Sequence, residues 1–219
     1  MALPVSMKKF GSWNFFGTPV RSLDLRRIDY WDGRIIGGMT NLVELKFDSL
    51  NDNFVCENGM VRSRDKTRLL FAPRSKATPR LPADVTTLDA WALCGEDVTV
   101  PRQITRIEPM AFGNCHALRR VRFESPNVSI GHHAFHYAVN LRQVDFPEGI
   151  RDISAPRVFS NCSSLRAIRF PVSVKRIGAE LFANCSSLRT VAFDGDAPEL
   201  VDDGRTLRGW DVFRGTPRY

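Results

Sequence analysis

The sequence contains little that points to chemistry or to a membrane. Its five cysteines are odd in number and include no C-x-x-C pair, so we expect neither a zinc site nor a dense disulfide framework. It has no glycine-rich phosphate loop, no nucleophile elbow and no paired-carboxylate signature, so we predict a protein that is not an enzyme and needs no cofactor. No apolar run approaches ~18 residues, which excludes a membrane-spanning helix.

A secretory leader is also missing from the start of the sequence. Residues 1–16 lack a basic region followed by an apolar stretch of ~7–15 residues. As written, the chain predicts a cytoplasmic protein, or a cell-surface protein if a leader was removed. Its 219 residues, 43% hydrophobic and 25% charged, fit one soluble domain, and its oligomeric state stays open.

What the sequence does contain is a repeat of about 23 residues, present in four copies over residues 101–193. Equivalent phenylalanines lie 23, 24 and 23 residues apart, with the extra residue between Ile153 and the third of them. These phenylalanines are Phe112, Phe135, Phe159 and Phe182. Self-similarity of this length over four copies predicts a solenoid.

Each copy shows two different hydrophobic patterns. The end of the copy, L-x-x-V-x-F, alternates as a short strand does, with Val and Phe on one face. The middle, A-F-x-x-C-x-x-L, has the i, i+3 spacing of a short helix. One copy cannot offset its own chain entropy, so the copies should stack and their strands should form a parallel sheet with a spacing of about 4.8 Å.

The complete pattern, a P-x-x-V-x-x-I segment followed by G-x-x-A-F-x-x-C-x-x-L-x-x-V-x-F, resembles the BspA-like class of leucine-rich repeats. Two copies depart from it, with Ala138 in place of Cys and Ser154 in place of Gly. The resemblance implies an α/β repeat fold, a leucine-rich-repeat solenoid with a parallel β-sheet on one face and short helices on the other. The best copy matches at Pro171, Val174, Ile177, Gly178, Phe182, Cys185, Leu188, Val191 and Phe193.

The remaining segments are interpreted as additions to this stack. Two turn signals, Asn58-Gly59 and residues 64–67, lie between short apolar segments and predict a β-hairpin insertion, which relatives of this class often carry. We predict one leucine-rich-repeat domain over 1–219. Its parts are an N-terminal arm or cap (1–22), a degenerate first repeat (23–47), the hairpin insertion (48–80), the repeats (81–193) and a C-terminal cap (194–219).

Three cysteines, Cys115, Cys162 and Cys185, occupy the same position of the repeat. We interpret them as buried apolar thiols, with a disulfide or metal role as the alternative.

His132 and His136 have an i, i+4 spacing that could chelate a metal on a helix, and His133 lies between them. No carboxylate or cysteine stands beside them in register, so we interpret all three as exposed histidines and predict no metal site.

The candidate binding surface consists of the strand residues that alternate with the buried ones. They should face outward on the concave side of the solenoid, where they form a mixed, not uniformly basic, surface. The predicted ligand-binding residues are Glu44, Lys46, Arg120, Arg122, Gln143, Asp145, Arg169 and Thr190.

Directly before the first outward-facing strand residue, each of the four copies carries an arginine. Like charges stacked at about 5 Å repel each other, so these side chains need water, acidic neighbours or an anionic partner. A solvated edge and a polyanion site are both open, and the formal charge of +7 is compatible with the second. The arginines are Arg119, Arg142, Arg166 and Arg189.

These observations together predict a non-enzymatic protein-binding module that presents its concave surface to a protein ligand. The resemblance implies a role in microbial surface attachment, because proteins of this class are often surface proteins of host-associated microbes. The alternative is an intracellular binder of a polyanion, either nucleic acid or sulfated sugar, that uses the arginines above.

Overall fold

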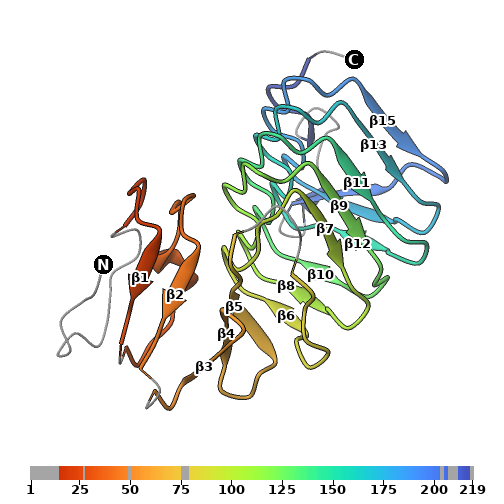
Figure 1. Cartoon of the computed structure of the whole chain (residues 1–219). Helices are drawn as coiled ribbons and strands as arrows, with labels where there is room; N and C mark the ends of the chain where they lie inside the picture. Colours follow the sequence, from red (N-terminus) through yellow and green to blue (C-terminus); the bar gives the residue numbers. More distant parts are fainter. Residues whose placement is uncertain are drawn as a thin grey trace.

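The computed structural model describes residues 15–26, 28–48, 51–74, 79–202, 205–206 and 212–217. They form a stack of similar coils in which each repeat contributes two short strands to two parallel ladders (Figure 1). In the described residues no helix is both long and apolar enough to cross a bilayer.

The first ladder is built from the four predicted L-x-x-V-x-F strands and one further strand that precedes them. In β9, Val121 and Phe123 are buried while Arg120 and Arg122 are exposed, as the alternation predicts. All neighbouring pairs in this ladder are parallel. Its strands are β7 (Asp97–Val100), β9 (Arg120–Phe123), β11 (Gln143–Asp145), β13 (Ala167–Phe170) and β15 (Thr190–Phe193).

The second ladder comes from the P-x-x-V-x-x-I segments, for which the sequence pattern predicted no strand. Most of these strands have two or three residues, pair in parallel with a neighbouring coil and carry a buried apolar residue such as Leu88, Ile107 or Ile177. The strands are β6 (Thr87–Leu88), β8 (Arg106–Ile107), β10 (Ser129–Ile130), β12 (Asp152–Ile153), β14 (Arg176–Gly178) and β16 (Glu199–Asp202), and β17 (Arg205–Thr206) pairs antiparallel with β16.

The N-terminal part contains a separate strand pair and an antiparallel meander. β1 (Ser22–Asp24) and β2 (Glu44–Lys46) are parallel and belong to neither ladder. The turn between β3 and β4 has Asn58 and Gly59 at φ values of 51° and 75°, which confirms the predicted hairpin. The meander consists of β3 (Phe54–Glu57), β4 (Met60–Ser63) and β5 (Arg68–Phe71), and β5 joins the second ladder beside β6.

The predicted short helices are wrong. Residues 79–202, which are described without a gap, contain no helix, and η1 (Gly33–Ile35) is a single 3-10 turn in the first repeat. Positive φ values at residues such as Met110 and Asn114 stop a helix from continuing. The backbone N–H groups instead bond to the next coil, as from Phe112 to Ala134 at 2.8 Å. We call this third set of inter-coil bonds the turn column.

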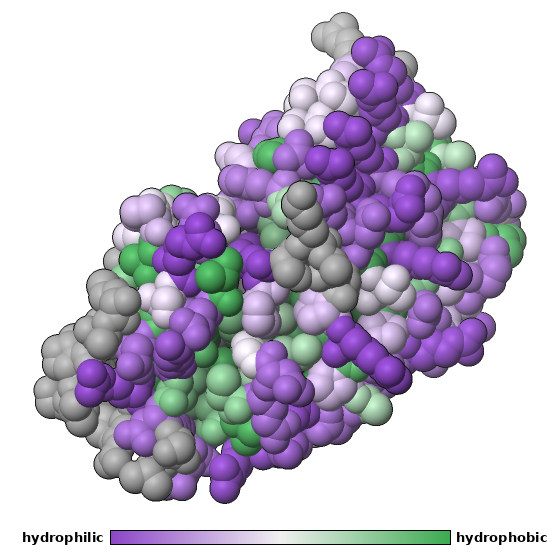
Figure 2. Space-filling view, viewed as in Figure 1, coloured by the Kyte–Doolittle hydropathy of each residue, from purple (hydrophilic) through white to green (hydrophobic). Residues whose placement is uncertain are grey.

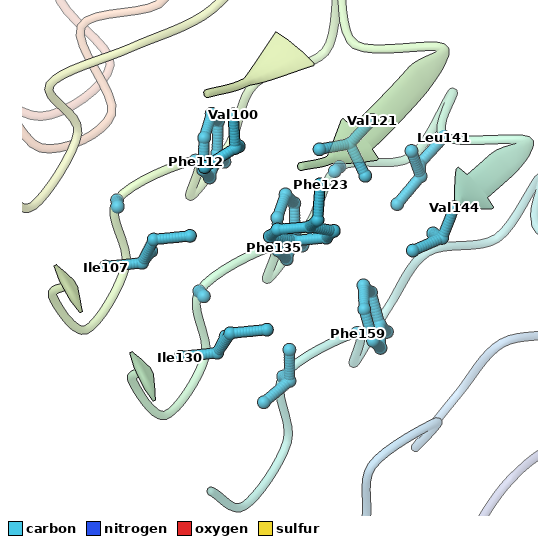
Figure 3. Close-up of a cluster of buried hydrophobic side chains, with 14 of the residues drawn as sticks. Val100, Ile107, Phe112, Val121, Phe123, Ile130, Phe135, Leu141, Val144 and Phe159 are labelled. Atoms are coloured by element: carbon cyan, nitrogen blue, oxygen red, sulfur yellow. The ribbon is translucent and has the colours of Figure 1, made fainter. Parts of the chain in front are cut away.

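Two stacks of phenylalanine rings fill the core and explain why the period is kept. In the first, ring centroids of adjacent coils are 4.7 to 5.9 Å apart, and Figure 3 shows its first three members one above another. In the second, the spacing is 5.1 to 5.5 Å. The first stack is Phe112, Phe135, Phe159, Phe182 and Phe213, and the second is Phe123, Phe146, Phe170 and Phe193.

The cysteine predictions are confirmed at two positions and wrong at one. Cys162 and Cys185 are buried free thiols, and burial raises the pKa of Cys185 to about 12. Cys115 forms a disulfide with Cys94, with a Cα separation of 5.4 Å. Cys94 belongs to the coil between Pro82 and Pro101, which we call the shortened coil because it spans only 19 residues; the repeat spacing is lost there, so the register gave no sign of the pair.

Both strand ladders are interrupted at the same place, which we call the seam. β11 does not continue into β13, and β10 does not continue into β12. The turn column is continuous across the seam, with Phe135 N–H donating to the Val158 carbonyl at 2.9 Å. The extra residue of the third copy falls between β11 and β13, whose equivalent residues are 24 apart, whereas β10 and β12 keep the usual spacing of 23 residues, so the extra residue does not account for the second interruption.

Candidate functional site

The outward side chains of the first ladder form one surface, which we call the strand face. Parallel pairing aligns them in two rows, in which Arg120 lies beside Gln143 and Arg122 lies beside Asp145. The remaining members are Asp97, Thr99, Ala167, Arg169, Thr190 and Ala192.

Six of the eight predicted ligand-binding residues belong to the strand face, and two do not. Glu44 and Lys46 lie on β2, in the separate β1–β2 pair, and bond to each other at 3.1 Å. A hydrogen bond from Ser22 and the neighbouring Lys46 lower the pKa of Glu44. Glu44 and Lys46 alternate with the buried Leu45, but their strand pairs with β1 in a separate sheet and is not part of the first ladder.

The sequence reasoning missed two residues of the strand face, Asp97 and Thr99 on β7. Their strand lies in the shortened coil and lacks the leading Leu of the motif. The alternation of Asp-Val-Thr-Val, with both valines buried, was the available signal.

Hydrogen bonds between neighbouring strands hold several side chains of the strand face. Arg120 Nε donates to Gln143 Oε1 at 3.0 Å, and Gln143 Nε2 donates to both carboxylate oxygens of Asp145 at 2.8 and 2.9 Å. Arg169 pairs with Asp194 at 2.6 Å, which raises the pKa of the arginine. A hollow of about 260 Å³ lies on β7, β9 and β11 and is lined by residues that include Asp97, Arg120 and Asp145.

The four predicted anion-binding arginines lie in two neighbouring pairs, one on each side of the seam, and together we call them the Arg column. Its backbone is continuous on each side of the seam, with 2.8 Å bonds from Arg142 to Arg119 and from Arg189 to Arg166. All four side chains are exposed, and within the described part of the chain none of them forms an ion pair.

The arginines of the second ladder behave differently from the Arg column. Arg68 pairs with Asp89 at 2.6 Å, Arg106 pairs with Glu108 at 2.7 Å, and Arg176 pairs with Asp152.

Figure 2 shows hydrophilic side chains over the upper right of the molecule, where Figure 1 places β11, β13 and β15.

The histidines lie in a turn rather than on a helix, so the spacing argument for chelation does not apply. His132 and His133 are in contact through their Nδ1 atoms at 3.1 Å, and His136 Nδ1 contacts Ser160 Oγ at 2.7 Å. Burial, followed by the neighbouring histidines, lowers the pKa of His133 to about 4. The described residues contain no group of three or more His, Cys, Asp or Glu side chains that could hold a metal ion.

Comparison with known proteins agrees with this architecture. The family described as BspA type leucine rich repeat region matches residues 89–202 in six copies, just over half of the chain. A search of curated proteins finds no match.

Several solved structures share the fold at low sequence identity. A leucine-rich repeat protein from Eubacterium ventriosum has a TM-score of 0.69 at 19% identity, with 100% of this chain and 65% of that chain covered. A leucine rich cell surface protein from Faecalibacterium prausnitzii has a TM-score of 0.53 at 17% identity, with coverage of 81% and 52%. The pneumococcal vaccine antigen PcpA has a TM-score of 0.56 at 16% identity, with coverage of 89% and 48%. This chain thus spans between about half and two thirds of the length of these solved chains.

Proposed function

The chain belongs to the BspA-type leucine-rich repeat family, and from this premise we propose that it is a non-enzymatic module that binds a protein ligand through the strand face. Attachment at a microbial surface is the setting we propose, because one structure of similar fold is described as a cell surface protein.

The observation that carries this proposal is the ordered, mixed-charge composition of the strand face. Gln143 links Arg120 to Asp145, so these three side chains are fixed across two strands before any partner arrives. A surface that is ordered beforehand loses little entropy on binding. Charges of both signs on one face fit a folded protein, whose surface also carries both signs, better than a ligand of uniform charge.

The test is a binding assay of the purified chain against fibronectin, type I collagen, heparin and duplex DNA. Each probe is measured at about 0.15 M and about 0.5 M salt, because screening is stronger at the second concentration. We expect a protein probe to bind at both. The strand-face variant Arg120→Ala/Arg122→Ala/Asp145→Ala should bind that probe about tenfold or more weakly, since central polar contacts of an interface carry much of its energy. A variant with unchanged affinity would exclude the strand face.

The second candidate is a polyanion site on the Arg column, favoured by the four arginines that form no ion pair among the described residues. Each phosphate contact on duplex DNA should contribute about −0.9 to the slope of log K against log salt. If only heparin or DNA binds, and the variant with all four arginines changed to alanine loses it, the Arg column is the site and the protein-binding proposal is wrong.

A further inference from the structure

A pocket apart from the strand face lies where the first repeat meets the coils of the main stack. Its volume is about 630 Å³, within the range of roughly 300–1,000 Å³ that small-molecule clefts occupy. It is lined by residues 30–34 of the first repeat, Arg68 of β5, residues 89–91, residues 108–110 and His132, so the first repeat, the meander and three coils of the main stack contribute to it.

Close backbone packing defines one side of this pocket. A Cβ atom on Gly33 would lie 2.6 Å from the Ala90 carbonyl oxygen. Only glycine therefore lets the first repeat approach the backbone at Ala90 this closely. Next to it, the Asp32 carboxylate accepts from both the backbone N–H and Nε of Arg34, each at 3.0 Å. The polar groups on this side are therefore held in place by the fold.

The charges around the pocket occur as arginine–carboxylate pairs. Arg34 pairs with Asp32, and Arg68 pairs at 2.6 Å with Asp89, which is only 6% exposed. The third carboxylate, Glu108, is paired at 2.7 Å with Arg106. An anion attracted to one of these arginines would therefore be repelled by the neighbouring carboxylate, and a cation attracted to a carboxylate would be repelled by the neighbouring arginine. A hydroxyl group meets no such conflict, because it can accept from a guanidinium and donate to a carboxylate.

Aromatic rings supply the apolar part of the pocket. Tyr30 is 55% exposed, so much of its ring remains free to contact a ligand. Trp31 is held by Phe47 and Phe54, with ring centroids at 6.2 and 6.3 Å. Pyranose rings combine an apolar C–H face with a rim of hydroxyl groups, and this combination matches rigid aromatic rings beside paired charges.

We propose that this pocket binds a neutral sugar, as a monosaccharide or disaccharide unit of a glycan. The site shares no residue with the strand face, so the sugar would be a second ligand and not a part of the protein interface.

The test uses saturation-transfer NMR and titration with lactose, cellobiose and N,N′-diacetylchitobiose. A sulfated heparin disaccharide and arginine methyl ester serve as anionic and cationic probes. We expect at least one neutral sugar to bind and both charged probes to bind more weakly. If no neutral sugar binds, or if a charged probe binds more tightly than all of them, the proposal is wrong.

Two variants and a matched control locate the site. Tyr30→Ala should weaken sugar binding roughly three- to tenfold, the effect of losing one aromatic contact, and Arg34→Gln should weaken it in the same direction. Tyr137→Ala, which removes a similarly exposed tyrosine outside the pocket, should leave binding unchanged. Equal losses in Tyr30→Ala and Tyr137→Ala would overturn the assignment. The strand-face variant should retain sugar binding. A negative result for the sugar pocket would therefore leave the protein-binding proposal unaffected, and a negative result for the strand face would leave the sugar proposal unaffected.

Discussion

Replacing Phe159 with alanine tests the repeat register at the centre of the stack. Its side chain is fully buried between Phe135 and Phe182, with ring centroids at 5.2 and 5.9 Å. Truncation of a buried phenylalanine costs about 3–5 kcal/mol. Within that figure, each of these two stacked contacts accounts for about 0.5–1.5 kcal/mol, and Phe146 makes a third contact, edge-on at 6.3 Å. Because the stack is continuous, neighbouring coils on both sides should lose packing.

The measurement is urea unfolding followed by tryptophan fluorescence, with the free energy of unfolding taken from the midpoint and the slope. Val172→Ala is the control, because Val172 is 53% exposed and its truncation should change the free energy by less than about 0.5 kcal/mol. A loss below about 1 kcal/mol for Phe159→Ala would refute the proposed register, since no fully buried ring is lost so cheaply.

Three further predictions concern the disulfide, a histidine and the seam. Reducing Cys94–Cys115, whose partners are 21 residues apart, should lower the free energy of unfolding by about 3 kcal/mol; an unchanged urea midpoint with reductant would contradict this. The pKa of His133 is lowered from its usual value of 6.5 to about 4 in the folded protein. As the pH falls from 6.5 towards 4, the unfolded chain therefore binds a proton at this residue before the folded chain does, and the free energy of unfolding decreases. His133→Asn, which suits the φ of 57°, should show a smaller drop in melting temperature from pH 7 to pH 4; an equal drop would argue against this role. Amides in residues 166–170 should exchange with deuterium faster than those in residues 142–146. The reason is that the hydrogen bonds from the N–H groups of residues 142–143 to the preceding coil have no counterpart across the seam. Equal exchange rates would mean that the ladder is continuous in solution.

Much of the core could be predicted because every coil repeats the same burial. Phe112 and Phe135 must fall in register if coils are to stack, and the periodic positions therefore predicted buried residues correctly. The helices were mispredicted for a physical reason. An i, i+3 apolar spacing suits a helical turn and also suits a tight turn whose N–H groups bond to the next coil, and the neighbouring coil decides between them. Asn114, Asn161 and Asn184, all at positive φ, were the available sign of the second arrangement.

The candidate site was predictable only where the motif is intact. Arg120 and Asp145 follow from alternation in the strand motif, and the structure places both on the strand face. Glu44 follows from the same alternation, but its strand pairs with β1 in a separate sheet and is not part of the first ladder. The sugar pocket could not be predicted, because it joins residues 30–34 to coils distant in the sequence.

Recognition through the strand face can be tested by comparing two charge-reversal variants for binding to the protein probe. Arg120→Glu/Arg122→Glu alters the strand face, while Arg151→Glu/Lys175→Glu makes the same charge change at exposed positions beside the second ladder. The account predicts a loss of about tenfold or more for the first pair and little change for the second. Equal losses, or a loss confined to the second pair, would contradict recognition through the strand face.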